Sequence, residues 1–313
     1  MSTHRLQTDE SVDEGVKRIA EELAADAQDH LAVDGPAEIP GAIHETRKLC
    51  KKARGLARLV RPALGDDYSR TNRCFRDAAR ELGPIRDPQA MSGTFEDLAA
   101  VPGLLDESVA KKTGDQLAQR ADDATKRILE DESERISNAS ALIDEARSLP
   151  VGWDLPNEFE PIRGGVAKTY KRGRKRFAEA EQERGADVFH EWRKRVKYVW
   201  YQTRLLRNSA PSILRPLANR FHDLSDALGD SHDLVVLGPV IDELDLEEAE
   251  ITAVKTASAG VRINLEDRAL SLASRLYAEE PNVFVHRLSL YWEAWQDGDE
   301  LEAGEIEDLF PPE

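Results

Sequence analysis

The segment His44-Glu45-Thr46-Arg47-Lys48-Leu49-Cys50-Lys51 returns further along the chain as His190-Glu191-Trp192-Arg193-Lys194-Arg195-Val196-Lys197. Five of these eight positions are identical at a constant offset of 146 residues. The match continues without a gap as far as Asp87 and Asp233, with thirteen identities between positions 44 and 87. The chain is therefore predicted to contain two copies of one unit, with residues 1–150 as the first copy and residues 151–313 as the second.

Helical patterns account for almost the whole chain. Apolar residues recur at helical spacing in 12–31, 115–149, 246–277 and 283–295, whereas strand patterns are scarce. Breakers such as Gly83-Pro84, Gly164-Gly165 and the cluster from Pro150 to Pro161 divide the chain into ten or so helices. We therefore predict an all-α protein, a duplicated helical bundle whose second copy ends in an acidic tail from Gly298 to Glu313.

The composition is that of a globular protein without a membrane span. Apolar residues make up 40% of the 313 residues, no run of about 18 apolar residues occurs, and the first residues are polar and acidic. We expect a cytoplasmic location. Cys50 and Cys74 are the only cysteines, too few for a disulfide framework or a zinc ribbon, and are expected in the core.

The net charge of −17 hides two basic regions. Residues 41–90 carry 12 Lys or Arg against 6 Asp or Glu, and residues 161–220 carry 16 against 5. The remaining positions hold 15 basic and 49 acidic residues. This asymmetry favours a local anion-binding surface. Ion pairs between neighbouring helices would account for the same counts, and the charges alone leave both interpretations open.

A helical wheel places the basic residues of each copy on one face, opposite the apolar residues. Like charges at i,i+4, such as Arg47 with Lys51, weaken a helix by about 0.2–0.5 kcal/mol each. Their presence in both copies suggests that an external anion relieves the repulsion. The two stripes are His44, Arg47, Lys48, Lys51 and Arg58, and His190, Arg193, Lys194, Lys197 and Arg204.

The duplicated motif resembles the CHAD domain, the conserved histidine α-helical domain. A second element, Leu82-Gly83-x-x-Arg86-Asp87 and Leu228-Gly229-x-x-His232-Asp233, is similar to one that closes the third helix of each half in that family. The resemblance implies two four-helix halves with pseudo-twofold symmetry, and basic helix faces that line a shared groove or channel and bind inorganic polyphosphate. The strand pattern of the CYTH domain found in many relatives is missing, so the chain looks like a standalone member.

The resemblance assigns the two stripes to polyphosphate binding. It adds a basic residue on the first helix of each half, Arg18 and Lys168, and Lys171 extends the second of these. On the third helix of the first copy, one face carries Arg73, Arg76 and Arg80, whereas the second copy has Asn219, His222 and Asp226 there. The site is therefore expected to be asymmetric.

Three other functions compete with this one. A zinc hydrolase fails, because Lys48 and Lys194 stand where a second histidine is required. A metal-dependent phosphohydrolase would be built on His222-Asp223 and His232-Asp233, and a nucleic-acid binder would use the same cations on a phosphodiester backbone. We expect that the protein is not an enzyme, needs no metal or organic cofactor and does not associate with membranes. We expect polyphosphate rather than nucleic acid as its partner, and an association with polyphosphate granules.

Overall fold

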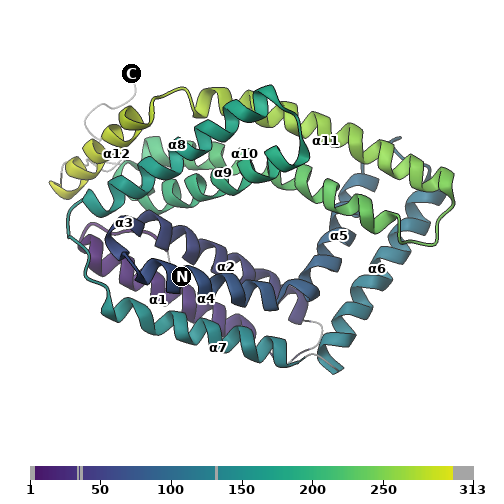
Figure 1. Cartoon of the computed structure of the whole chain (residues 1–313), viewed down its shortest axis with the longest axis horizontal. Coiled ribbons are helices and arrows are strands. Elements are labelled where there is room, and N and C mark those ends of the chain that lie inside the picture. The colour runs from purple at the N-terminus through teal and green to yellow at the C-terminus, as the bar shows by residue number, and fades with distance from the viewer. Residues whose placement is uncertain (1–3, 34, 36–37, 131–132, 299–313) are drawn as a thin grey trace, which may run out of the picture.

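The computed structural model describes residues 4–33, 35, 38–130 and 133–298, and these are helical almost throughout, with no strand among them (Figure 1). The prediction of an all-α protein is confirmed. The helices of the first 150 residues are α1 (Val12–Leu31), α2 (Ile39–Leu59), α3 (Arg61–Leu64), α4 (Asp67–Glu81), α5 (Gly83–Ala99), α6 (Glu107–Glu130) and α7 (Glu134–Ser148). The later ones are α8 (Glu160–Gln182), α9 (Ala186–Leu206), α10 (Pro211–Ile241), α11 (Glu248–Leu276) and α12 (Pro281–Gln296).

Helices α1, α2, α4 and α7 pack side by side into one bundle. Helix α1 shows why these residues form a helix. Ser11 and Glu14 make reciprocal capping bonds at its start, which satisfy backbone N–H groups that have no partner within the helix. Its buried residues Val12, Val16 and Ile19 recur at helical spacing and face the core of the bundle.

The second half forms its own bundle from α8, α9, α12 and the first part of α10. Aromatic rings fill its centre, where Tyr170 stacks on Phe284 with ring centroids 4.0 Å apart. The Tyr170 hydroxyl donates to the backbone oxygen of Leu276 at 2.9 Å, so this buried polar group is satisfied.

The two halves meet twice. Helices α2 and α9 cross within the main core, and a second, smaller core joins α5 and α6 to the far parts of α10 and α11. This second core contains Phe95, Leu117, Leu237 and Val254. In Figure 1 the α10–α11 pair reaches across to α5 and α6, so that the helices close into a ring. Residues of α2, α5, α9 and α10 line a common cavity.

Several predicted boundaries are wrong for physical reasons. Gly164-Gly165 does not end a helix but lies inside α8, where a Cβ on Gly165 would fall 1.7 Å from the backbone oxygen of Leu59. These glycines therefore permit close approach of α8 to α2. The segment 115–149 contributes to two helices, α6 and α7. The predicted acidic tail lies outside the described residues beyond Gly298.

The helix bounds recur along the chain, with α2 beginning at Ile39 and α9 at Ala186. Gly55 and Tyr201, which are related by the sequence offset, touch each other, because a Cβ on Gly55 would lie 3.0 Å from Tyr201 Cδ2. Contact between equivalent residues is what a twofold axis through the α2–α9 crossing would produce. The pseudo-twofold relation and the division at residue 150 stay predictions. Both cysteines are buried, as expected.

Candidate anion-binding site

A cavity of about 490 Å³ opens between α2, α5, α9 and α10. Both copies of the repeated motif contribute cations to it. Its lining also contains histidines and carboxylates, so the charges are mixed and not purely positive. The cationic residues are Arg47, Lys48, Lys51, Arg86, Arg193 and Lys197; the histidines are His44, His222 and His232; and the carboxylates are Asp87, Asp226, Asp230 and Asp233.

In each copy, the basic motif and the Leu-Gly-x-x-Arg/His-Asp element contact each other through equivalent residues. In the first copy, Arg86 Nε donates to His44 Nδ1 at 2.9 Å. In the second copy, the equivalent residues His190 and His232 bring their Nδ1 atoms to 3.1 Å. The element with Leu-Gly-x-x-Arg/His-Asp therefore orients the histidine of the basic motif in both copies.

The glycine of this element makes room for the motif arginine. A Cβ on Gly83 would lie 3.1 Å from Arg47 Nη1, and a Cβ on Gly229 would lie 3.7 Å from Arg193 Nε. Arg47 Nη1 donates to the backbone oxygen of Ala79 at 2.8 Å near the end of α4. It thereby fixes the packing of α4 on α2 as well as facing the cavity.

The partners of the two arginines differ. Arg47 Nη2 donates to Asp87 Oδ1 at 3.2 Å, an ion pair at the rim of the cavity. Burial raises the pKa of Asp233 and Arg193 opposes that shift, while the buried Nε atom of Arg193 has no hydrogen-bond partner in the described part of the chain. An unsatisfied buried donor of this kind is uncommon in folded proteins. Arg193 is thus the motif cation with capacity left for a ligand.

Two lysines at equivalent positions lie half-buried in the cavity. Burial lowers the pKa of Lys51 to about 7, with further lowering by Lys197, Arg47 and Arg193. Burial and Arg193 likewise lower the pKa of Lys197 to about 8. Both shifts favour the neutral amine, because a charged amine lacks water and faces other cations. A bound anion would reverse both effects.

The histidines respond to the same surroundings. Burial and the neighbouring Arg86 lower the pKa of His44, and burial with Lys194 and Arg193 lowers that of His190. Burial, His190 and the nearby cations lower the pKa of His232 to about 4. The ligand-free protein therefore keeps His44, His190 and His232 neutral near pH 7.

The carboxylates of α10 partly balance these cations. Burial raises the pKa of Asp233, against the opposing effect of Arg193 and Lys197. Burial and the neighbouring carboxylates Asp226 and Asp233 raise the pKa of Asp230. Both carboxylates offset part of the positive charge of the cavity, so a bound anion needs contacts with several cations. The cavity suits an anion that offers several charges to several cations at once.

Each motif glutamate pairs with the lysine three residues later. Lys48 Nζ lies 3.1 Å from Glu45 Oε1, and Lys194 Nζ lies 2.5 Å from Glu191 Oε1. One of the two structural roles expected for these acids is thus observed. Lys48 lines the cavity, whereas Lys194 and His190 lie beside it.

The ends of the two stripes do not reach this cavity. Arg58 and Lys168 line a separate cleft of about 190 Å³ between α2, α3, α8 and α9. Arg204 lines a third, much smaller cavity of about 20 Å³ together with His4 and Lys52. The two ends of each stripe therefore line separate spaces, because the α2–α9 crossing lies between them.

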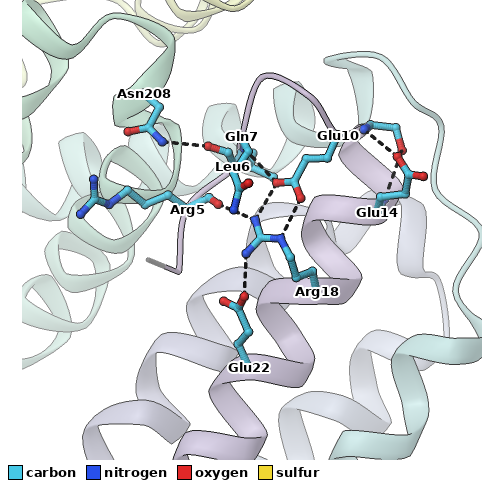
Figure 2. A network of polar contacts seen from close by, with 9 residues as sticks. Arg5, Leu6, Gln7, Glu10, Glu14, Arg18, Glu22 and Asn208 are labelled. Carbon is cyan, nitrogen blue, oxygen red and sulfur yellow. Dashed lines mark hydrogen bonds and ion pairs between the residues drawn. The ribbon is translucent and has the colours of Figure 1, made fainter. Parts of the chain in front are cut away.

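Arg18 lines none of the three spaces, contrary to its assignment, and Figure 2 shows its guanidinium between Glu10, Glu22 and the backbone of Arg5. Its Nε and Nη2 atoms donate to Glu10 at 2.7 and 2.6 Å, and Nη1 donates to Glu22 at 2.9 Å. Nη2 also donates to the backbone oxygen of Arg5 at 2.7 Å. Arg18 therefore anchors the N-terminal segment on α1.

The third-helix arginines lie on the exposed face of α4, and Lys171 is exposed on α8. None of these four residues lines the cavity. Arg76 Nε donates to Asp77 at 2.8 Å, and Arg80 lies 3.6 Å from the same carboxylate. The wheel correctly groups Arg73, Arg76 and Arg80 on one face, but that face points outward because the core face of α4 packs against α2 and α7.

Sequence reasoning gave Arg86 no binding role, although its element was recognised, and it did not assign Trp200 or Tyr201 to the cavity wall. The recurrence of Leu-Gly-x-x-Arg/His-Asp at the motif's own offset was the available signal for Arg86. Trp192, by contrast, is fully buried in the core, as its side of the wheel predicts.

Two of the four residues named for a metal-dependent phosphohydrolase, His222 and Asp223, pair with other side chains. His222 Nδ1 lies 2.7 Å from Asp226, and Asp223 accepts from Arg220 at 2.9 Å. Among residues 4–298, apart from the few positions left undescribed, no group of three or more His, Cys, Asp or Glu side chains is arranged to hold a metal ion. None of the described helices is long and apolar enough to cross a membrane.

Comparison with known proteins agrees with the helical architecture. A family model described as CHAD domain matches residues 17–242. The crystal structure of the CHAD domain from the plant Ricinus communis is similar, with a TM-score of 0.52 and 19% sequence identity over 87% of this chain and 93% of that chain. At this identity the likeness concerns the fold. No curated protein matches the sequence significantly.

Proposed function

The chain belongs to the CHAD domain family, and from this membership together with the basic cavity we propose that it binds inorganic polyphosphate. The observation that carries the proposal is the convergence of equivalent cations from both repeats on one cavity, above all Lys51, Lys197 and Arg193. These residues are separated by up to 146 positions in the chain. Their like charges repel one another in the absence of a ligand.

Polyphosphate suits this arrangement because it places about one negative charge on each phosphate of a flexible strand. Arg193 can offer a forked pair of N–H donors to one phosphate, since its Nε has no other partner. Lys51 and Lys197 act as point charges for neighbouring phosphates. Several weak contacts on one strand raise the effective concentration for each further contact.

Binding of a nucleic-acid backbone is the alternative that uses the same cations. The cavity lies between four helices, so a stiff duplex cannot follow it, and the negative charge elsewhere on the chain opposes a long polyanion outside it. A flexible single strand is the stronger competitor. We further propose that the protein is a binder without hydrolytic activity and without a cofactor, in the cytoplasm or on polyphosphate granules.

Calorimetric titration with long-chain polyphosphate, pyrophosphate and single-stranded RNA at equal phosphate concentration tests the proposal. Long-chain polyphosphate should bind most tightly, and its affinity should fall steeply as salt rises. Affinity independent of chain length, or displacement of polyphosphate by RNA, would falsify the proposal.

A charge-reversal variant adds a residue-level control. Arg193→Glu should lower polyphosphate affinity by at least about tenfold, because it removes charge-assisted bonds and adds repulsion. Arg73→Glu, on the exposed face of α4, makes the same charge change outside the cavity and should have little effect.

A further inference from the structure

The cleft between α2, α3, α8 and α9 is a second cationic site, distinct from the central cavity. Five positively charged side chains surround it, and its volume is about 190 Å³. The glycine pair of α8 brings that helix against the end of α2 and so forms the floor of the cleft. The five cations are Arg58, Arg61, Lys168, Arg172 and Arg195.

Few carboxylates balance these cations. Arg195 lies 3.6 Å from Glu191, which also binds Lys194. No carboxylate of the described residues forms an ion pair with Arg61, Lys168 or Arg172. Arg61 lowers the pKa of Lys168, so these charges repel one another without a ligand.

Arg58 is held in place by aromatic rings. Its guanidinium carbon lies 4.2 Å from the ring centroid of Tyr198, a cation–π contact. Among the residues that the structure describes, its buried Nε finds no hydrogen-bond partner. Arg61 is positioned in the same way over Tyr68, at 4.4 Å from the ring centroid. These two guanidinium groups are therefore preorganised, which lowers the entropic cost of binding an anion.

The equivalent place in the first repeat is covered by the chain itself. Arg204, the equivalent of Arg58, lines a cavity of only about 20 Å³ together with His4 and Lys52. His4 belongs to the N-terminal segment and lies 3.0 Å from Asp26 of α1. The protein therefore closes this place with its own N-terminal segment and leaves the cleft at Arg58 open.

We infer that the open cleft binds a compact phosphate anion, such as pyrophosphate, independently of the central cavity. A terminal phosphate group, with up to two negative charges spread over its oxygens, matches two forked guanidinium groups and a lysine within one small cleft. The same group occurs in free pyrophosphate and at the end of a polyphosphate strand.

Titration of the whole protein with pyrophosphate tests the inference. The variant Arg61→Gln/Arg172→Gln should lose pyrophosphate affinity by at least about tenfold. The cavity variant Lys51→Met/Lys197→Met should keep that affinity. Lys171→Gln/Lys175→Gln is the matched control, since both lysines lie exposed on α8 outside the cleft.

The outcomes separate the two sites. The inference is overturned if the unaltered protein does not bind pyrophosphate. It is also overturned if the cavity variant loses pyrophosphate binding while the cleft variant keeps it. Both outcomes are independent of the affinity for polyphosphate. Should Arg61→Gln/Arg172→Gln fail to fold, Lys168→Gln at an exposed position gives the same test. Polyphosphate with blocked ends distinguishes free pyrophosphate from strand ends as the ligand. If strand ends bind in the cleft, blocked polyphosphate should bind the unaltered protein more weakly than open-ended polyphosphate. The two should then bind the cleft variant equally.

Discussion

Lys51 and Lys197 hold the same position in the two repeats and line the same cavity, where burial and then the charge of Lys197 lower the pKa of Lys51. Two half-buried amines of like charge destabilise the folded protein when both are protonated. Their retention at equivalent positions makes sense if an anion neutralises them. The fold thus places one lysine from each repeat in the same cavity.

Replacing Lys51 by methionine should stabilise the ligand-free protein while weakening polyphosphate binding. Methionine keeps the flexible apolar stem and removes the charge. The pKa of Lys51 falls from 10.5 when unfolded to about 7 when folded, so the unfolded chain binds more protons between these values. The destabilisation therefore grows as pH falls from 10.5 to 7 and is complete below pH 7.

Melting curves in phosphate-free buffer measure this effect. Lys51→Met should raise the melting temperature by roughly 2 °C or more at pH 6.5 and leave it nearly unchanged at pH 10.5. Lys171→Met, at an exposed position of α8, is the control. A melting temperature that falls at pH 6.5 would show that Lys51 is a structural residue and not a charge held for a ligand.

Polyphosphate binding should take up protons near neutral pH. Lys51 and Lys197 have pKa values of about 7 and about 8 without ligand, so at pH 7.5 a share of both is neutral. A nearby phosphate raises both pKa values, and affinity should therefore increase as pH falls from about 9 to about 6.5. His44, whose pKa lies below its usual value, contributes only at lower pH.

Calorimetry at pH 7.5 in buffers with different ionisation enthalpies counts these protons. The unaltered protein should take up a measurable fraction of a proton, and Lys51→Met/Lys197→Met should take up much less. Equal uptake by both proteins would assign the protons to other groups.

The repeat made much of this fold predictable. An offset in sequence, together with helical spacing, was enough to predict an all-α chain and to place His44, Arg47, Lys51, Arg193 and Lys197 on inward-facing helix surfaces. A helical wheel uses only local geometry, and the faces of α2 and α9 that carry these residues are also the faces that line the cavity. Local geometry and tertiary position therefore agree for them.

The remaining assignments depended on contacts that a wheel does not contain. Arg18 binds Glu10 because the N-terminal segment folds back over α1. Arg58 is separated from Lys51 by the α2–α9 crossing, although both lie on one stripe. The cavity carboxylates, such as Asp233, are contributed by α10, whose position follows from the closure of the ring.

Neutralising the three arginines of α4 should leave polyphosphate affinity nearly unchanged. The sequence alone predicts a larger loss for these than for the equivalent positions of the second repeat, but their face of α4 is exposed. Asp226, by contrast, lines the cavity and faces its cations. Polyphosphate titrations of the triple variant Arg73→Gln/Arg76→Gln/Arg80→Gln and of Asp226→Asn at one ionic strength compare the outer face of α4 with the cavity. A larger change of affinity in the triple variant than in Asp226→Asn would place the ligand on the outer face of α4.

The two motif glycines should respond differently to alanine. A Cβ on Gly83 would lie 3.1 Å from Arg47 Nη1, tighter than an ordinary contact, whereas a Cβ on Gly229 would lie 3.7 Å from Arg193 Nε. Gly83→Ala should therefore displace the Arg47 guanidinium from the backbone oxygen of Ala79 and lower stability by about 1 kcal/mol. Gly229→Ala, inside α10, should raise stability by roughly 0.5–1 kcal/mol, because alanine favours the helix. Urea unfolding of both variants without ligand measures the difference, and stabilisation by both substitutions would mean that Arg47 moves aside without losing its bond.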